Sequence, residues 1–221
     1  MSKSLQERIL SAGILAPLVL ALIWTGGVIF NILVVITAII MAFEWCSIIY
    51  SQEGDAEYSN KWVILGTIYI SIFASSLIYL RDIDGGFGNI LYLVLIVWAT
   101  DIAAYFSGRY IGGPKIAVKI SPNKTWAGLI GGMIAAGLVS SVASFLIDDA
   151  NLILYFIIGT FLAVFAQVGD FFESWLKRKF AVKDSGSIIP GHGGVMDRVD
   201  GLVTVSALLA ILALIRGGAL F

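Results

Sequence analysis

Polar residues in this chain gather in a few short segments between long apolar runs, and the richest segment spans 174–201. It combines lysines and arginines with glycines and aspartates. Glycine lets a backbone approach a phosphate closely, and basic side chains supply the opposite charge. This composition therefore indicates a phosphate site. A loop that only met anionic lipid would explain its cations but not its glycines and aspartates.

Two aspartates flank this loop. Asp170 lies near the end of the apolar run before it and Asp197 near the start of the next, so a hairpin can bring the two carboxylates together. Asp200 follows Asp197 by about one helical turn on the same face. Mg²⁺ in proteins takes one or two carboxylates plus substrate phosphates. We therefore predict a magnesium site formed by Asp170, Asp197 and Asp200.

Asp170 also belongs to a polar stripe on a predicted helix. At 100° per residue, one face carries polar side chains and the opposite face carries mostly aromatic ones. The polar face holds Gln167, Asp170, Glu173, Ser174 and Lys177, and the other holds Phe171, Phe172, Trp175 and Leu176. This pattern is typical of a membrane helix with lipid on one side and a hydrated cavity on the other. An acid at the membrane centre costs about 2.5–3.5 kcal/mol on insertion scales, so embedded acids are functional by default.

Two further acids lie within or at the edge of apolar runs. Asp101 shares a similar stripe with Tyr105 and Gly108, where simple helix packing and a ligand role explain it equally well. For Glu44 the simpler expectation is a side chain hydrated at the membrane interface.

A second candidate anion site lies in the segment 112–126. Ser121 followed by Pro122 is typical of a helix N-cap and first helical position. Free N–H groups at such an end, beside Lys124 and Thr125 in the first turn, would favour an anion. We predict that Ser121, Lys124 and Thr125 contact a phosphate. The alternative is an ordinary capped helix with a snorkelling lysine.

The composition indicates which elements position these residues. Of 221 residues, 59% are hydrophobic and 13% charged, against about 45–50% and 25% in soluble domains. Seven runs are long enough to cross a bilayer as helices, namely 9–25, 27–50, 62–80, 88–108, 126–147, 152–175 and 201–220. We predict an all-α polytopic integral membrane protein of about seven transmembrane helices. Polar loops would join helices 4 and 5 and helices 6 and 7. The net charge of −1 gives no reason to expect nucleic acid.

The basic residues predict the orientation. With seven spans, all of the 14 lysines and arginines except Arg81 and Arg216 fall on the side of the N-terminus. The positive-inside rule then places the N-terminus and the polar loops in the cytoplasm.

The segment 174–200 closely resembles the signature of CDP-diacylglycerol synthases, also called phosphatidate cytidylyltransferases. It carries serine, two residues, Lys-Arg, then Lys-Asp, His-Gly-Gly, two residues, Asp-Arg and a final aspartate. The segments 101–109, 121–125 and 167–174 also look like the family, so the resemblance covers about 98–201. No linker divides the chain, so we predict one membrane domain over 1–221. The resemblance implies a cytidylyltransferase core in 88–221, after N-terminal spans in 1–80.

The resemblance implies a reaction in a bacterial inner membrane: CTP and phosphatidic acid give CDP-diacylglycerol and pyrophosphate. Mg²⁺ would be required, and a second cation and a homodimer stay open. Asp170 and Asp197 would hold metal in this scheme. As hypothesis, phosphates would be neutralised by Lys177, Arg178, Lys183 and Arg198. Asp101 would orient a lysine or a metal-bound water. His192, between two glycines, would donate to a phosphate or make a structural contact.

Two other functions fit parts of the pattern. A CTP-dependent lipid kinase acting on a polyprenol or dolichol would share the nucleotide and metal features but release CDP instead of pyrophosphate. A secondary transporter also carries embedded acids, yet it predicts inverted repeats and breaks near the middle of the membrane. Here the charges concentrate at one interface, which favours the enzyme.

Overall fold

The computed structural model describes residues 13, 17–51, 56–146, 151–189 and 193–218. Six helices in these ranges are long and apolar enough to cross a membrane: α2 (Gly27–Ile49), α3 (Ala56–Asp82), α4 (Gly86–Tyr110), α5 (Trp126–Ser144), α6 (Leu152–Lys179) and α7 (Met196–Ile215). The predicted all-α polytopic membrane fold is confirmed. The predicted count of seven is not, because the first predicted span, 9–25, lies largely outside the described residues, although 17–25 are helical.

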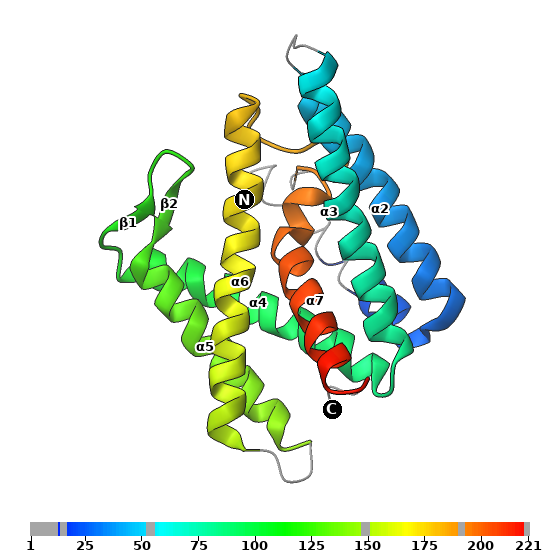
Figure 1. The fold of residues 1–221 in the computed structure, drawn as a ribbon. Coiled ribbons are helices and arrows are strands. Elements are labelled where there is room, and N and C mark those ends of the chain that lie inside the picture. Colours follow the sequence, from blue (N-terminus) through cyan, green and yellow to red (C-terminus); the bar gives the residue numbers. More distant parts are fainter. Residues whose placement is uncertain (1–12, 14–16, 52–55, 147–150, 190–192, 219–221) are drawn as a thin grey trace.

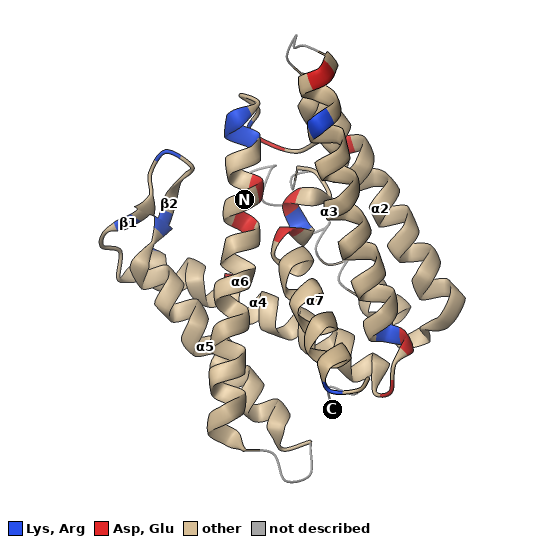
Figure 2. Cartoon of the chain, viewed as in Figure 1, with Lys and Arg blue, Asp and Glu red and all other residues tan. Residues whose placement is uncertain are grey.

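The helices form a bundle in which α6 and α7 lie in the middle (Figure 1). The α2–α3 pair lies on one side of them, and α5 lies on the other. The ends of α2, α4 and α6 and the starts of α3, α5 and α7 share one end of the bundle, which we call the site end. Charged residues gather toward this end of the ribbon, and few lie at the opposite end (Figure 2).

Small residues let α4, α5 and α6 approach closely. A methyl group built on Gly132 of α5 would lie 2.9 Å from the carbonyl oxygen of Thr100 in α4. One on Gly128 would lie 2.9 Å from the carbonyl oxygen of Ala104. Gly159 of α6 meets the backbone of α5 even more closely. Such contacts between backbones are how membrane helices gain van der Waals energy without a hydrophobic driving force.

The connection from α4 to α5 differs from the prediction. Ser121 does not cap a helix, because a two-stranded antiparallel hairpin, β1 (Lys115–Ala117) and β2 (Ser121–Thr125), precedes α5. Pro122 fits in β2 because a strand of a two-stranded hairpin has an edge that needs no N–H donor. Thr125 is extended, with φ −119°, and its hydroxyl accepts a 3.0 Å hydrogen bond from the Gly128 amide. The helix therefore begins four residues later than predicted, with Thr125 as its N-cap.

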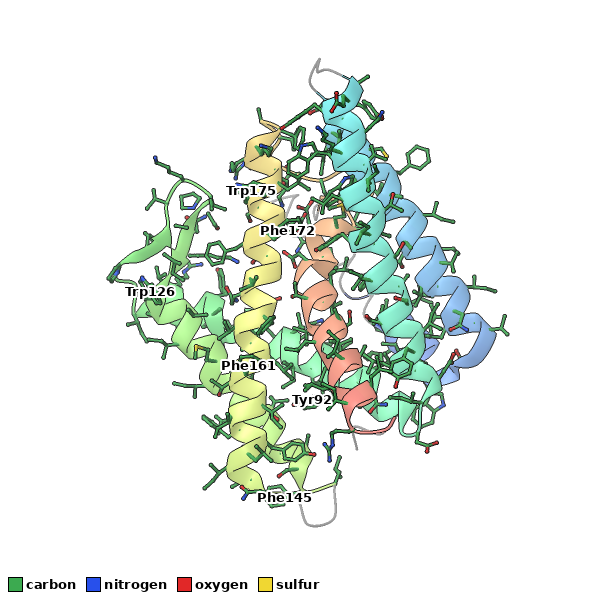
Figure 3. All side chains as sticks on the ribbon, viewed as in Figure 1. Tyr92, Trp126, Phe145, Phe161, Phe172 and Trp175 are labelled. Carbon is green, nitrogen blue, oxygen red and sulfur yellow. The ribbon has the colours of Figure 1, made fainter. Side chains whose placement is uncertain are left out.

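The aromatic side of α6 also differs from the prediction, because much of it faces protein rather than lipid. Leu176 is fully buried, and the Phe172 ring lies 5.3 Å from that of Tyr69 in α3 and 6.4 Å from that of Trp45 in α2, centroid to centroid. Phe172 and Trp175 both lie in the half of α6 nearer the site end (Figure 3). The α2–α3 pair covers this side, which periodicity along α6 alone cannot reveal.

Candidate active site

A polar cavity of about 610 Å³ opens at the site end between α4, α5, α6, α7 and the hairpin. Its charged lining residues are Asp101, Arg109, Lys115, Lys124, Asp170, Asp197, Arg198 and Asp200. A larger cavity of about 1020 Å³ lies between the other ends of α4 and α5, but its lining is glycine and apolar or aromatic side chains. Among the described residues, this larger cavity has no charged side chains in its lining that could bind an ionic substrate or a metal. The polar cavity is therefore the candidate active site.

Three aspartates reach the cavity from three helices. Asp101 comes from α4 and is open to solvent, Asp170 comes from α6, and Asp200 comes from the first turns of α7. Lys124 of β2 forms an ion pair with Asp170, and its ammonium lies 4.3 Å above the centre of the Phe171 ring. Asp170 Oδ1 accepts a 3.3 Å hydrogen bond from Ser174. The hairpin therefore places a cation directly against the acidic side of the cavity.

Asp197 lines the same cavity, but its carboxylate is engaged on both oxygens. Lys177 Nζ donates to Oδ1 at 2.5 Å. Oδ2 accepts from the Ser185 amide at 3.0 Å, the Ser185 hydroxyl at 2.9 Å and the Gly194 amide at 2.9 Å. Lys177 also lies 3.3 Å from Glu173. Asp197 thus joins the end of α6, the following loop and the start of α7.

Of the other residues predicted to contact substrate, some line the cavity and others lie outside it. Thr125 lines the cavity, although its hydroxyl caps α5. Ser121 pairs with Ala117 in the hairpin, and the guanidinium of Arg178 donates to the Val182 carbonyl at 3.2 Å. Ser121, Lys177, Arg178 and Lys183 are not among the cavity-lining residues; Lys183 is exposed in the loop. His192 falls outside the described residues.

Glu44 is the residue that the sequence reasoning missed. It is not hydrated at an interface: its side chain is buried, 3% exposed, and binds the loop before α7. Its Oε1 accepts from the Val195 amide at 2.8 Å, and its Oε2 accepts from the Met196 amide at 2.8 Å and the Ser185 hydroxyl at 3.2 Å. A glutamate within an otherwise apolar span was the available signal.

The aspartate carboxylates in the polar cavity could bind a divalent cation together with a substrate phosphate. Among the described residues, no three acidic, histidine or cysteine side chains are gathered closely enough to form a complete metal cage. Mg²⁺ does not require one, since it keeps waters and binds through one or two carboxylates together with substrate phosphates. Lysine and arginine in the same cavity supply charge for those phosphates. The donor set therefore fits Mg²⁺ with a phosphorylated ligand.

The fold and this cavity define a polytopic membrane protein with a site for phosphorylated ligands at one end of its helices. Residues 59–215 match the family model described as Cytidylyltransferase family. The chain is 36% identical to a phosphatidate cytidylyltransferase of Brucella suis biovar 1 (strain 1330) over 250 aligned residues, covering 93% of this chain and 92% of the relative. A protein of the same name from Rickettsia bellii (strain RML369-C) is 42% identical over 214 residues, covering 93% and 89%.

This chain belongs to the cytidylyltransferase family, so the resemblance noted in its sequence is confirmed. The family match includes every residue predicted for the site. It does not include α2 or Glu44.

Proposed function

We propose that this protein transfers the CMP part of CTP to phosphatidic acid, giving CDP-diacylglycerol and pyrophosphate for phospholipid synthesis. The observation that carries the proposal is the cavity at the site end, where three helices and a basic hairpin combine aspartates with cations. The two relatives named phosphatidate cytidylyltransferase support it, because this chain covers about nine-tenths of each. A lipid substrate also suits a cavity that opens between membrane helices.

The proposed mechanism needs no general base. A phosphate monoester has a second pKa near ~6, so the phosphate of phosphatidic acid is already largely dianionic at neutral pH. It attacks the α-phosphorus of CTP in line: a new P–O bond forms, and the bond to the bridging oxygen of pyrophosphate breaks. Lys124 and Arg198 line the cavity and would neutralise phosphate charge there. Catalysis would rest on positioning and electrostatic stabilisation, as in phosphoryl transfer generally.

We propose that the cavity aspartates hold Mg²⁺. Asp170 and Asp200 present carboxylates to the cavity, and Asp197 adds a third beside them. Magnesium held by these residues would supply positive charge for the phosphates of CTP. Asp170 is paired with Lys124 in this structure. From its place beside Asp170 in the cavity, the Lys124 ammonium would also neutralise a substrate phosphate. Asp101 of α4 would orient Lys124 or a water molecule.

We propose that the site end faces the cytoplasm of a bacterium, where CTP is made. The described basic residues lie mostly at this end, as the positive-inside rule requires for a cytoplasmic side (Figure 2). The bacterial relatives agree with an inner-membrane location. A homodimer stays a prediction.

The test is pyrophosphate release by the purified protein in detergent micelles that contain phosphatidic acid, with CTP and Mg²⁺ in the buffer. We expect release that requires both substrates and stops when the metal is chelated. Diacylglycerol in place of phosphatidic acid is the matched control, because it lacks the nucleophilic phosphate and should give no release. Formation of CDP with a polyprenol would indicate a lipid kinase. If folded protein gave no turnover with phosphatidic acid or with a polyprenol, the proposal would be refuted.

A further inference from the structure

Glu44 lies in α2, but its carboxylate caps the start of another helix, α7. The first N–H groups of an α-helix have no partner within the helix and carry its positive dipole end. At the start of α7 the N-cap residue, Val195, makes no side-chain cap. The two oxygens of Glu44, which belongs to α2, instead accept from the amides of Val195 and Met196, each at 2.8 Å. Each oxygen of the Glu44 carboxylate therefore accepts a hydrogen bond from an amide at the start of α7.

A single hydroxyl connects Glu44 to the cavity. Ser185 Oγ lies 3.2 Å from Glu44 Oε2 and 2.9 Å from Asp197 Oδ2, and the residue is 4% exposed. A hydroxyl has one proton, so it donates to one carboxylate at a time. Asp197 follows Met196 directly, in the turn of α7 whose amides Glu44 holds. The position of the Asp197 carboxylate thus depends on Glu44 through both the backbone of α7 and Ser185.

The loop around Glu44 is shaped to fit it. A methyl group built on Gly186 would lie 2.9 Å from Glu44 Oε1, and one on Gly194 would lie 2.7 Å from both carboxylate oxygens. These distances are shorter than real contacts of that kind, so each glycine leaves only the space that the carboxylate fills. The described parts of the loop between α6 and α7, at Gly186 and Gly194, therefore pack around a side chain that comes from outside the matched family region.

We infer that Glu44 is a positioning residue of the active site: by capping α7 and binding Ser185 it holds Asp197 and the loop before it in their working places. The inference rests on the proposed function for its assay. It makes α2 part of the catalytic unit and not only a membrane anchor. Glu44 itself does not line the cavity, so it does not touch the substrates.

The experiment compares Glu44→Gln with the parent protein and with Glu57→Gln. Glu57 is an exposed glutamate whose side chain is 77% accessible and pairs with Lys61 at the site end of α3, so its variant controls for losing one negative charge there. Glutamine keeps the size of glutamate but places an NH₂ group against a backbone N–H donor. We measure kcat and KM for CTP, correcting for the folded fraction found by thermal unfolding. Removing a residue that orients a ligand group costs about 10- to 100-fold in activity.

We expect Glu44→Gln to lower kcat by about 10-fold or more at saturating CTP and Mg²⁺, while Glu57→Gln keeps the parental value. A purely structural role would lower the folded fraction but leave kcat per folded molecule unchanged, and that result would overturn the inference.

If Glu44→Gln does not fold, the variant Gly186→Ala tests the inference in its place. It pushes the loop off Glu44 without removing a charge, so a reduced kcat supports the inference and a parental kcat overturns it. Inactivity of the parent protein would refute the proposed function and not the role of Glu44 as a cap, which the unfolding temperatures of the variants still report.

Discussion

Replacing Asp197 with asparagine removes one charge at the point where α6, the loop and α7 meet. The carboxylate accepts four hydrogen bonds, one from Lys177 at Oδ1 and three from Ser185 and Gly194 at Oδ2. Asparagine has one acceptor oxygen. If this oxygen takes the place of Oδ2, the amide NH₂ group faces the ammonium of Lys177. Donor then meets donor, and Lys177 is left with Glu173, 3.3 Å away.

The magnitude follows from the lost charge-assisted hydrogen bond. A hydrogen bond to a charged group is worth about 1.5–3 kcal/mol, and about 1.4 kcal/mol corresponds to a tenfold rate change. If the transition state depends on this geometry, Asp197→Asn should lower kcat/KM by about 10- to 150-fold. A metal-ligand role for the same carboxylate would make the loss larger, and the apparent affinity for Mg²⁺ would fall with it.

The assay is pyrophosphate release across a range of Mg²⁺ concentrations, with unfolding temperatures measured in parallel. Asp84→Asn is the matched control, because Asp84 is exposed in the turn between α3 and α4, at the end opposite the cavity. The reasoning is refuted if folded Asp197→Asn stays within about twofold of the parent, a difference of about 0.4 kcal/mol.

Two further predictions concern the hairpin and the helix packing. Lys124→Ala removes the partner of Asp170 and a phosphate contact, so KM for CTP should rise about tenfold or more, while Lys61→Ala, at an exposed surface pair, should leave KM unchanged. An unchanged KM in Lys124→Ala would exclude the phosphate contact. Gly159→Leu should destabilise the fold by ~1–3 kcal/mol, because α5 backbone fills the space beside Gly159, whereas Gly88→Ala meets open space and should not. Equal unfolding temperatures for these two variants would contradict the close packing.

The sequence was sufficient to predict the six described membrane helices, because a run of about 20 apolar residues is long enough to cross a bilayer as a helix. It also singled out Asp170 as an acid that is costly inside a span, and Asp200 because it follows Asp197 by one helical turn. Both line the cavity, and their roles stay predictions. Local patterns misplaced the start of α5. Ser-Pro is compatible with a helix N-terminus or with an extended segment, and the pairing of Lys115 with Thr125 that decides between them is a contact between separate segments.

Glu44 shows a different limit of sequence reasoning. The acid was visible in the apolar run, but its partners are 141 to 152 residues away along the chain. No periodicity within α2 indicates which distant loop will cover a given face. The same limit explains the aromatic side of α6, whose neighbours come from α2 and α3.

The long separation between Glu44 and the amides of α7 has a consequence for biosynthesis. During translation α2 leaves the ribosome long before α7, and its glutamate enters the membrane before its donors are made. Its two backbone donors arrive only with the start of α7, 151 residues after Glu44 for Val195. A ribosome-bound chain that stops before α7 therefore holds an acid without its backbone donors, which is costly in the bilayer. Completion of the cavity and burial of this carboxylate therefore both wait for α7.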